Sequence, residues 1–137
     1  DDLDADGDLD AVISRHGRPL VLRNDGSGRF TLFERLLQTR GLANDVVIAD
    51  VDSDGLNDIF LPMTGTDQFF CNPGTSQPWV PALNWLPPDH EASRQAVVGD
   101  FNGDHRPDLY VANDGQDVLW LQRETSPPEI TPSHTPQ

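Results

Sequence analysis

The stretch DVDSDGLND at residues 50–58, called loop 2 below, places an aspartate at its first, third, fifth and ninth positions. The same pattern occurs twice more in the 137-residue chain, as DLDADGDLD at residues 2–10 (loop 1) and as DFNGDHRPD at residues 100–108 (loop 3). Successive copies begin 48 and 50 residues apart, at Asp2, Asp50 and Asp100. Repeats of this length are typical of solenoids, propellers and repeat arrays.

The repeat extends beyond these loops, because turn residues recur at constant distances after each ninth-position aspartate. A glycine follows seven residues later in every copy: Gly17, Gly65 and Gly115. In the first two copies an Asn-x-Gly turn follows, with Asn24 and Asn72 as its first residues. One repeat therefore predicts strand, acidic loop, strand, glycine turn, strand, second turn and returning strand, which is the order of a propeller blade.

Short apolar runs rich in β-branched and aromatic residues lie between the loops and turns. They occupy residues 11–13, 20–22, 46–48, 59–61, 69–70, 96–98, 109–111 and 118–121, and each is typical of a strand. Residues 31–38 fit either a short helix or the fourth strand of their repeat. The sequence thus predicts an all-β fold of about three propeller blades.

These patterns give the following domain organisation. We expect a propeller fragment at residues 1–124, with repeats at about 1–43, 44–93 and 94–124. Residues 125–137, TSPPEITPSHTPQ, are rich in proline, serine and threonine, and we expect a disordered tail or linker there. A closed ring of blades needs roughly 200 to 400 residues at this period, so further propeller repeats are missing from this chain.

The composition excludes several classes of partner. The net charge of −14 repels nucleic acid and anionic membrane surfaces and attracts cations. No apolar stretch approaches the ~20 residues of a membrane-spanning helix, so we expect no membrane insertion. Cys71 is the only cysteine, which excludes a disulfide within the chain and a cysteine-based zinc cluster.

The spacing of the loop side chains predicts a calcium site in each loop. Side-chain oxygens at positions 1, 3, 5 and 9, with a backbone carbonyl at position 7, can surround one hard cation, and calcium fits this ligand number better than magnesium or zinc does. The candidate ligands are Asp2, Asp4, Asp6, Asp8 and Asp10 in loop 1, Asp50, Asp52, Asp54, Leu56 and Asp58 in loop 2, and Asp100, Asn102, Asp104, Arg106 and Asp108 in loop 3. Glycine at position 6, as in Gly7 and Gly55, allows the backbone to turn around the ion, whereas loop 3 has His105 there. We expect loop 2 to bind most tightly and loop 3 most weakly.

The calcium loop of the EF-hand is excluded, because it needs a glutamate at position 12, where this chain has Ile13, Leu61 and Val111. The segments DLDADGDLDAV, DVDSDGLNDIF and DFNGDHRPDLYV instead resemble the FG-GAP or VCBS-type repeats of integrin-α-like β-propellers, over about residues 1 to 122. The resemblance implies a propeller with one calcium in the first inter-strand hairpin of several blades. It also implies an extracellular protein used for binding, as in cell adhesion.

Other conspicuous side chains have structural interpretations. Trp79, Trp85 and Trp120 are expected in the core between blades rather than stacked on a sugar, although residues 79–90 are also expected as a surface excursion where specificity varies. Cys71 is expected as a small buried hydrophobe rather than a nucleophile. The four histidines, His16, His90, His105 and His134, lack metal-ligand spacing and are expected to be exposed.

We therefore expect a calcium-binding repeat module that binds or scaffolds a protein or carbohydrate ligand outside the cell, at the cell surface or in the periplasm. We expect no enzyme activity, because acids crowded around a cation stay ionised and cannot act as general acids. Two alternatives remain open: the non-catalytic propeller region of a larger secreted enzyme, and a purely structural surface repeat.

Overall fold

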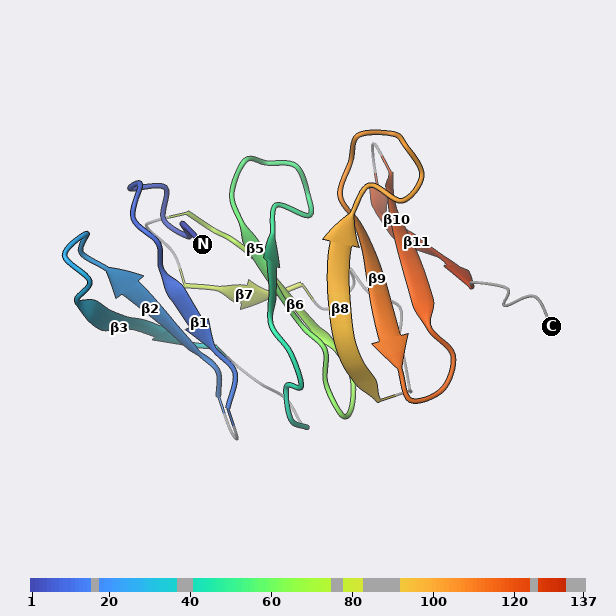
Figure 1. The fold of residues 1–137 in the computed structure, drawn as a ribbon, viewed down its shortest axis with the longest axis horizontal. Helices are drawn as coiled ribbons and strands as arrows, with labels where there is room; N and C mark the ends of the chain where they lie inside the picture. Colours follow the sequence, from blue (N-terminus) through green and yellow to red (C-terminus); the bar gives the residue numbers. More distant parts are fainter. Residues whose placement is uncertain (16–17, 37–40, 75–77, 83–91, 124–125, 133–137) are drawn as a thin grey trace.

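The chain folds into three small antiparallel sheets placed side by side (Figure 1). The structure, a computed structural model, describes residues 1–15, 18–36, 41–74, 78–82, 92–123 and 126–132. Within these ranges every regular element is a strand, so the predicted all-β fold is confirmed. In the same ranges no helix is long and apolar enough to span a bilayer.

The first sheet contains β1 (Ala11–Ile13), β2 (Leu20–Asn24) and β3 (Phe30–Arg35), in that order. The middle sheet contains β4 (Val47–Ala49), β5 (Asp58–Leu61), β6 (Gln68–Cys71) and β7 (Val80–Pro81). The last sheet contains β8 (Ser93–Gly99), β9 (Asp108–Asn113), β10 (Val118–Arg123) and β11 (Ser126–Pro132). Each sheet is a meander in which consecutive strands pair, as expected of a blade.

The acidic loops occupy equivalent places in the three sheets. Loop 2 joins β4 to β5 and loop 3 joins β8 to β9, while loop 1 leads into β1. The ninth-position aspartates of loops 2 and 3 pair across their hairpins with Ala49 and Gly99, the residues before each loop begins. All three loops lie along the same edge of the molecule, at the top of Figure 1.

Two hydrophobic cores hold the sheets together. The core between the first and middle sheets consists of Leu3, Val21, Leu36, Ile59, Leu61, Met63, Phe70 and Trp79. The core between the middle and last sheets consists of Val51, Phe60, Phe69, Ala96, Leu109, Val111 and Trp120. Because side chains alternate along a strand, the buried strand β5 contributes to both cores, with Phe60 edge-on to Trp120 at a ring-centroid distance of 5.6 Å. The core positions predicted for Trp79 and Trp120 are confirmed.

One expectation about a chain segment was wrong, a second is tested only at its first residues, and one alternative is decided. Residues 126–132, expected in a tail or linker, form β11 and pair with β10, because the open edge of β10 offers backbone groups and an edge strand tolerates proline. Of residues 79–90, expected as a surface excursion, residues 83–90 lie outside the described residues, whereas Trp79 is 4% exposed and its backbone N–H donates to Glu34 Oε2 at 3.0 Å. Residues 30–35 are a strand, so the fourth-strand interpretation holds for that part of residues 31–38.

Some expectations fall on parts of the chain that the structure does not describe. Trp85, His16, His90 and His134 lie outside the described residues. His105 lies within them, and its side chain is 96% exposed, as expected.

Candidate metal centre in the acidic loops

The ninth-position aspartate is buried in every loop and binds the backbone with both carboxylate oxygens. Asp58 is fully buried; one of its oxygens accepts the N–H of Val51 at 3.0 Å and the other accepts the N–H of Asn72 at 2.8 Å. Asp10 makes the equivalent bonds to Leu3 and Asn24, and Asp108 makes them to Phe101 and Gln122. This aspartate therefore joins the start of its loop to the second strand after the loop, at or near the end of that strand.

The first-position aspartate holds the middle of the loop. Asp50 accepts the N–H groups of Asp54 and Gly55, each at 3.0 Å. In loop 3, Asp100 accepts the equivalent groups of Asp104 and His105, and in loop 1 the N–H of Gly7 donates to Asp2 at 3.0 Å. Because these bonds form within the chain, the loops are ordered by their own hydrogen bonds.

Two residues of each loop adopt the left-handed backbone conformation. Position 6 has φ of 95° in Gly7, 91° in Gly55 and 67° in His105, so His105 adopts the conformation of the glycines that it replaces. Position 4 is also left-handed, with φ of 58° in Ala5, 63° in Ser53 and 80° in Gly103, which the sequence did not reveal. Each loop thus has one glycine and one non-glycine residue in this region, and loop 3 exchanges their positions.

In loop 1 three carboxylates converge. Oxygens of Asp2, Asp4 and Asp6 all lie within 4.8 Å of one another. One oxygen of Asp2 and one of Asp4 are buried without any hydrogen-bond partner, and the Asp4 side chain is only 10% exposed. Burial, followed by the charges of Asp10 and Asp6, raises the pKa of Asp4. Buried carboxylate oxygens without partners are costly, and a bound cation would compensate them.

An arginine stands beside this cluster. Arg23 Nε lies 3.1 Å from the other oxygen of Asp4, and its guanidinium carbon lies 3.6 Å from the centre of the Phe33 ring. The arginine balances one charge of loop 1 and leaves the unpartnered oxygens of Asp2 and Asp4 free to bind an ion.

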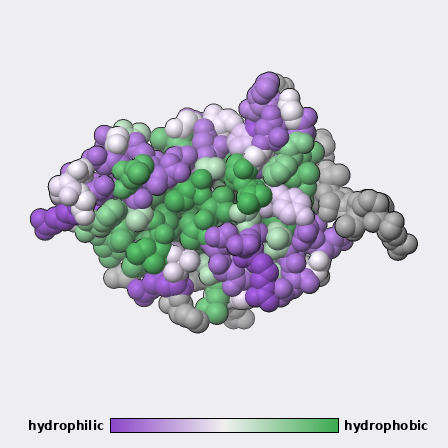
Figure 2. Space-filling view, viewed as in Figure 1, coloured by the Kyte–Doolittle hydropathy of each residue, from purple (hydrophilic) through white to green (hydrophobic). Residues whose placement is uncertain are grey.

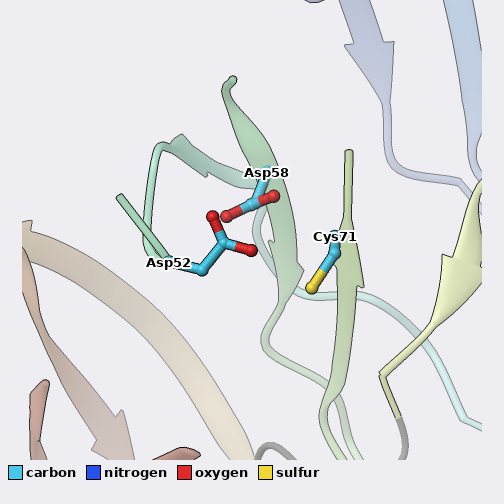
Figure 3. A group of neighbouring side chains, drawn as sticks. All are labelled: Asp52, Asp58 and Cys71. Atoms are coloured by element: carbon cyan, nitrogen blue, oxygen red, sulfur yellow. The ribbon is translucent and has the colours of Figure 1, made fainter. Parts of the chain in front are cut away.

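In loop 2 the carboxylates of positions 1, 3 and 5 also converge. Oxygens of Asp50, Asp52 and Asp54 lie within 4.8 Å of one another, and Asp52 forms a second group of the same size with Asp58 and Cys71 (Figure 3). Burial raises the pKa of Asp58 to about 7, and burial together with the charge of Asp54 raises the pKa of Asp52. Burial and crowding therefore disfavour the ionised form of two of the four acids of loop 2 in the metal-free chain.

The thiol of Cys71 lies beside Asp52 and Asp58, with one ligand atom of each of the three residues within 4.8 Å of the other two (Figure 3). Burial, reinforced by the charges of Asp58 and Asp52, raises the pKa of this thiol to about 12. The thiol is neutral and half-buried, and it packs against the core between the middle and last sheets. Such a thiol is a poor nucleophile, which agrees with the interpretation of Cys71 as a small buried hydrophobe.

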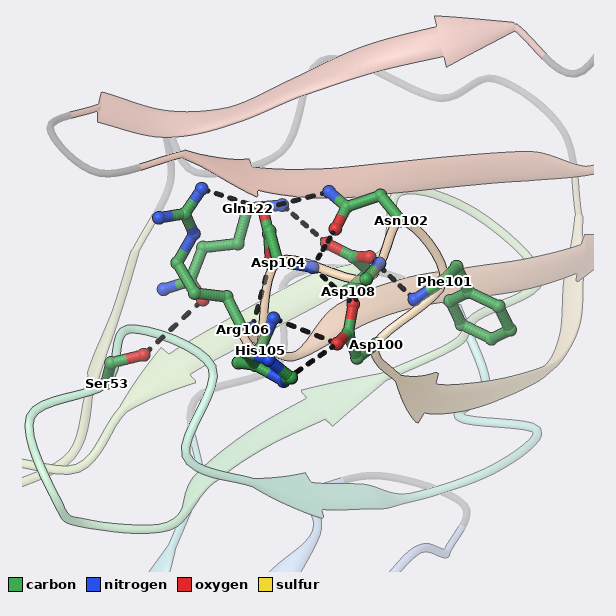
Figure 4. A network of polar contacts seen from close by, with 10 residues as sticks. Ser53, Asp100, Phe101, Asn102, Asp104, His105, Arg106, Asp108 and Gln122 are labelled. Carbon is green, nitrogen blue, oxygen red and sulfur yellow. Dashed lines mark hydrogen bonds and ion pairs between the residues drawn. The ribbon is translucent and has the colours of Figure 1, made fainter.

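Loop 3 neutralises part of its own charge. Arg106 Nη2 lies 2.7 Å from Asp104 Oδ2, and the side-chain amide of Asn102 donates to the same oxygen at 3.0 Å (Figure 4). Burial opposes it, but hydrogen bonds from Arg106 and Asn102 lower the pKa of Asp104. A backbone hydrogen bond from His105 lowers the pKa of Asp100. Loop 3 thus has fewer free carboxylate oxygens than loops 1 and 2.

The structure brings together most, but not all, of the residues predicted as ligands. The side chains at positions 1, 3 and 5 converge in loops 1 and 2. The ninth-position aspartates accept hydrogen bonds from backbone N–H groups with both of their oxygens. At position 7, the N–H groups of Asp8, Leu56 and Arg106 donate to the position 5 carboxylates, and metal binding by their carbonyls stays a prediction.

The sequence did not reveal two neighbours of the loops, Arg23 and Cys71. Both lie thirteen residues after a ninth-position aspartate, Asp10 and Asp58 respectively. That shared distance, which places them on equivalent strands beside the acids, was the available signal.

Neighbouring loops are also connected to one another. Asn72 donates its side-chain amide to the Leu3 carbonyl of loop 1 at 2.8 Å and to the Asn57 carbonyl of loop 2 at 2.9 Å. Ser53 of loop 2 donates to Gln122 of the last sheet at 3.4 Å. These hydrogen bonds therefore join loop 2 directly to the last sheet, and join loops 1 and 2 through Asn72 of the middle sheet.

Comparison with known families agrees with this repeated construction. No curated protein sequence matches the chain. The family model of the FG-GAP-like repeat matches twice, at residues 2–61 and 50–111, so that each match begins at an acidic loop and ends in the strand that follows the next loop. The matches together span residues 2–111, well over half of the 137 residues. Three sheets that share one loop geometry, and two matches in the same register, make this chain a member of the FG-GAP-like repeat family, a β-propeller-like repeat module whose ring is not closed here.

Proposed function

We propose that the chain is a calcium-binding repeat module that stabilises an extracellular binding or scaffolding surface. The observation that carries the proposal is the convergence of three carboxylates in loop 1 and again in loop 2, with buried Asp2 and Asp4 oxygens that have no partner. Carboxylate oxygens are the ligands that calcium prefers, and their close approach without an ion is repulsive.

Calcium would act here as a structural ion. When bound, it supplies the positive charge that the clustered carboxylates lack. The chain already holds the loops in shape, because Asp50 binds the N–H groups of Asp54 and Gly55, and Asp58 anchors the loop to Asn72. Little ordering is therefore required when the ion arrives, which favours affinity.

The location and the ligand class rest on two general arguments. FG-GAP-like repeats are typical of extracellular or surface proteins, and extracellular calcium modules have Kd of about 10⁻⁴ to 10⁻³ M, which suits fluids outside the cell. At millimolar calcium, about half to nine-tenths of such sites would be occupied. The partner is proposed to be a protein or a carbohydrate.

Thermal unfolding tests the calcium proposal. An ion that binds only the folded form stabilises it by RT ln(1 + [L]/Kd), or about 1.4 kcal/mol per site when calcium is at ten times its Kd. Millimolar calcium should raise the melting temperature of the chelator-treated chain, and equal magnesium should raise it less. Identical melting temperatures in calcium and in chelator would overturn the proposal.

A matched pair of variants separates specific binding from general charge screening. Asp52→Asn, in the loop 2 cluster, should reduce the calcium-dependent rise. Asp25→Asn removes the same charge from an exposed turn of the first sheet and should leave the rise unchanged.

A further inference from the structure

Two asparagines of the middle sheet connect loop 1 to loop 2. Asn72, which is 5% exposed, donates one side-chain hydrogen bond to the Leu3 carbonyl of loop 1 at 2.8 Å and another to the Asn57 carbonyl of loop 2 at 2.9 Å. Asn57, at position 8 of loop 2, donates its side-chain amide to the Asp2 carbonyl at 3.2 Å and to the Asp1 carboxylate at 3.1 Å. Loop 2 and the residue that follows β6 therefore both hold the beginning of loop 1.

These contacts belong to an unbroken chain of hydrogen bonds between the ninth-position aspartates of the two loops. Asp10 accepts the N–H of Leu3 at 2.9 Å. The carbonyl of Leu3 accepts the Asn72 side-chain amide, and the backbone N–H of Asn72 donates to Asp58 at 2.8 Å. The side-chain oxygen of Asn72 is also used, because the N–H of Gly74 donates to it at 3.0 Å. Asn72 therefore keeps all of these bonds only while both loops keep the shape described above, which we call the closed shape.

The closed shape of loop 1 has an electrostatic cost that an ion would remove. One oxygen of Asp2 and one of Asp4 are buried without a hydrogen-bond partner, and burial of unpaired carboxylate oxygens opposes the closed shape. A cation bound to those oxygens favours the closed shape, in which the backbone carbonyls of loop 1 accept hydrogen bonds from Asn57 and Asn72. An ion in loop 1 therefore holds both asparagines in the places that they have in the closed shape of loop 2.

We propose that calcium binding in loops 1 and 2 is cooperative, with Asn57 and Asn72 as the residues that couple the two loops. The inference rests on the calcium function proposed above, and it adds that an ion in one loop raises the calcium affinity of the other. A ligand that binds the closed shape better shifts the population toward that shape, and the shared hydrogen bonds extend this shift to the second loop. Because binding linkage is reciprocal, loop 1 must affect loop 2 by the same factor as loop 2 affects loop 1.

The junction between loops 2 and 3 provides an internal comparison, because other residues replace both asparagines there. Pro107 stands at position 8 of loop 3, where loop 2 has Asn57, and proline has no side-chain amide. Gln122 stands where the middle sheet has Asn72, and it accepts a hydrogen bond from Ser53 of loop 2 at the longer distance of 3.4 Å. Coupling between loops 2 and 3 should therefore be weaker than coupling between loops 1 and 2.

Repulsion between the two bound ions opposes this coupling. The loops lie along one edge of the molecule in Figure 1, and the same edge is mostly hydrophilic in the space-filling view of Figure 2, so the ions would lie near solvent. Charges near solvent are screened at about 0.15 M salt, where the Debye length is about 8 Å. Salt screens the buried contacts of Asn72 much less. The coupling should therefore be measured at that salt concentration or above it.

Calcium titration of the 137-residue chain, followed by NMR, tests the coupling because loops 1 and 2 each have their own reporter. The N–H groups of Gly7 and Gly55 donate to the first-position aspartate of their own loop. Their amide resonances therefore give a separate calcium Kd for each loop. Asp52→Asn, which removes a proposed ligand of loop 2, should raise the Kd reported by Gly7 about fivefold. Asp4→Asn should raise the Kd reported by Gly55 by the same factor.

Two variants and a matched control test the coupling residues themselves. In Asn57→Ala and in Asn72→Ala, the loss of the loop 2 ligand should leave the Kd of loop 1 nearly unchanged. Since the Asn57 side chain is partly exposed, its alanine variant tests the coupling even where loss of the buried Asn72 amide unfolds the chain. The control Asn24→Ala removes the equivalent side-chain bond within loop 1, to the Leu9 carbonyl at 3.1 Å, and should keep the full effect.

The outcomes separate the coupling from the calcium function. A loop 1 Kd that is the same with and without Asp52→Asn would overturn the coupling and leave calcium binding in place. So would a lower Kd in Asp52→Asn, which is the result of repulsion between the ions, or an undiminished effect in both asparagine variants. If neither glycine resonance responds to millimolar calcium, the calcium function is overturned and the coupling with it.

Discussion

Asp58 accepts a hydrogen bond from the backbone N–H of Asn72 at 2.8 Å, across the fourteen residues that separate loop 2 from the end of β6. Its second oxygen accepts the N–H of Val51 at 3.0 Å. Asp10 and Asp108 repeat both contacts in the other loops. The ninth-position aspartate therefore ties the loop to the following strand, whereas the first, third and fifth positions bring their charge together within the loop.

Replacing Asp58 by asparagine should destabilise the chain even without calcium. An amide offers one acceptor oxygen, so its NH₂ group would face a buried N–H of either Val51 or Asn72. A buried donor left without a partner costs about 1–3 kcal/mol. Urea unfolding in chelator should show this loss for Asp58→Asn and little loss for Asp54→Asn, which removes a charge from the exposed side of the same loop. Equal stability of the two variants would contradict the backbone role.

Replacing Asp52 by asparagine should have opposite effects with and without calcium. Burial and the charge of Asp54 raise the pKa of Asp52, so the ionised carboxylate is unfavourable in the metal-free fold. Its removal should raise the melting temperature in chelator by a few degrees and should lower it in millimolar calcium, where a ligand is lost. A shift of the same sign in both solutions would count against the site.

Stability of the metal-free chain should fall as pH rises through the neutral range. Burial raises the pKa of Asp58 to about 7 from 3.8, so the folded state keeps a proton that the unfolded chain has lost. This contribution is fully present below pH 4 and disappears as pH approaches and passes 7. Urea unfolding in chelator should show lower stability at pH 8 than at pH 5. Stability that rises over this interval would contradict the assignment.

Calcium should compete with this proton. A cation beside Asp58 favours the ionised carboxylate, so calcium binding at pH 6 should release protons, and calcium affinity should increase between pH 6 and pH 8. Calorimetry in two buffers of different ionisation enthalpy measures the release. An affinity that does not change with pH would show that Asp58 does not contact the ion.

The loops should differ in affinity. Loop 2 has four acids, three of which converge, whereas loop 3 has three acids, one of which, Asp104, is already paired with Arg106. Asp52→Ala should therefore reduce total calcium binding more than Asp104→Ala does, as measured by calorimetric titration of both variants. The reverse order would show that charge count and internal ion pairs do not set affinity here.

The sequence predicted the features that depend on local chemistry. The spacing of the acids located all three loops, and apolar runs located eight of the eleven strands in the described part of the chain, because both patterns are periodic along the chain; β7 was among the strands missed. The sequence left residues 31–38 as either helix or strand, because the choice depends on a pairing partner. Phe30–Arg35 forms a strand because it pairs with the edge of β2. β11 was missed for the same reason, because its pairing partner is an exposed strand edge rather than a pattern in its own proline-rich sequence.

The site contained details that spacing alone does not give. The left-handed conformations of Ala5 and Ser53 have no glycine to reveal them. The backbone role of Asp58 depends on an N–H group fourteen residues away, and every residue type except proline offers one. The nearness of Arg23 to Asp4, and of Cys71 to Asp52, follows from how adjacent strands lie beside the loops.

Isothermal titration of calcium into the metal-free chain at pH 7.5 tests the central claim most directly. The account predicts binding at two or more sites with Kd of about 10⁻⁴ to 10⁻³ M, and a reduced stoichiometry in Asp52→Asn but not in Asp25→Asn. Heats no larger than those of dilution, or equal binding by both variants, would contradict it.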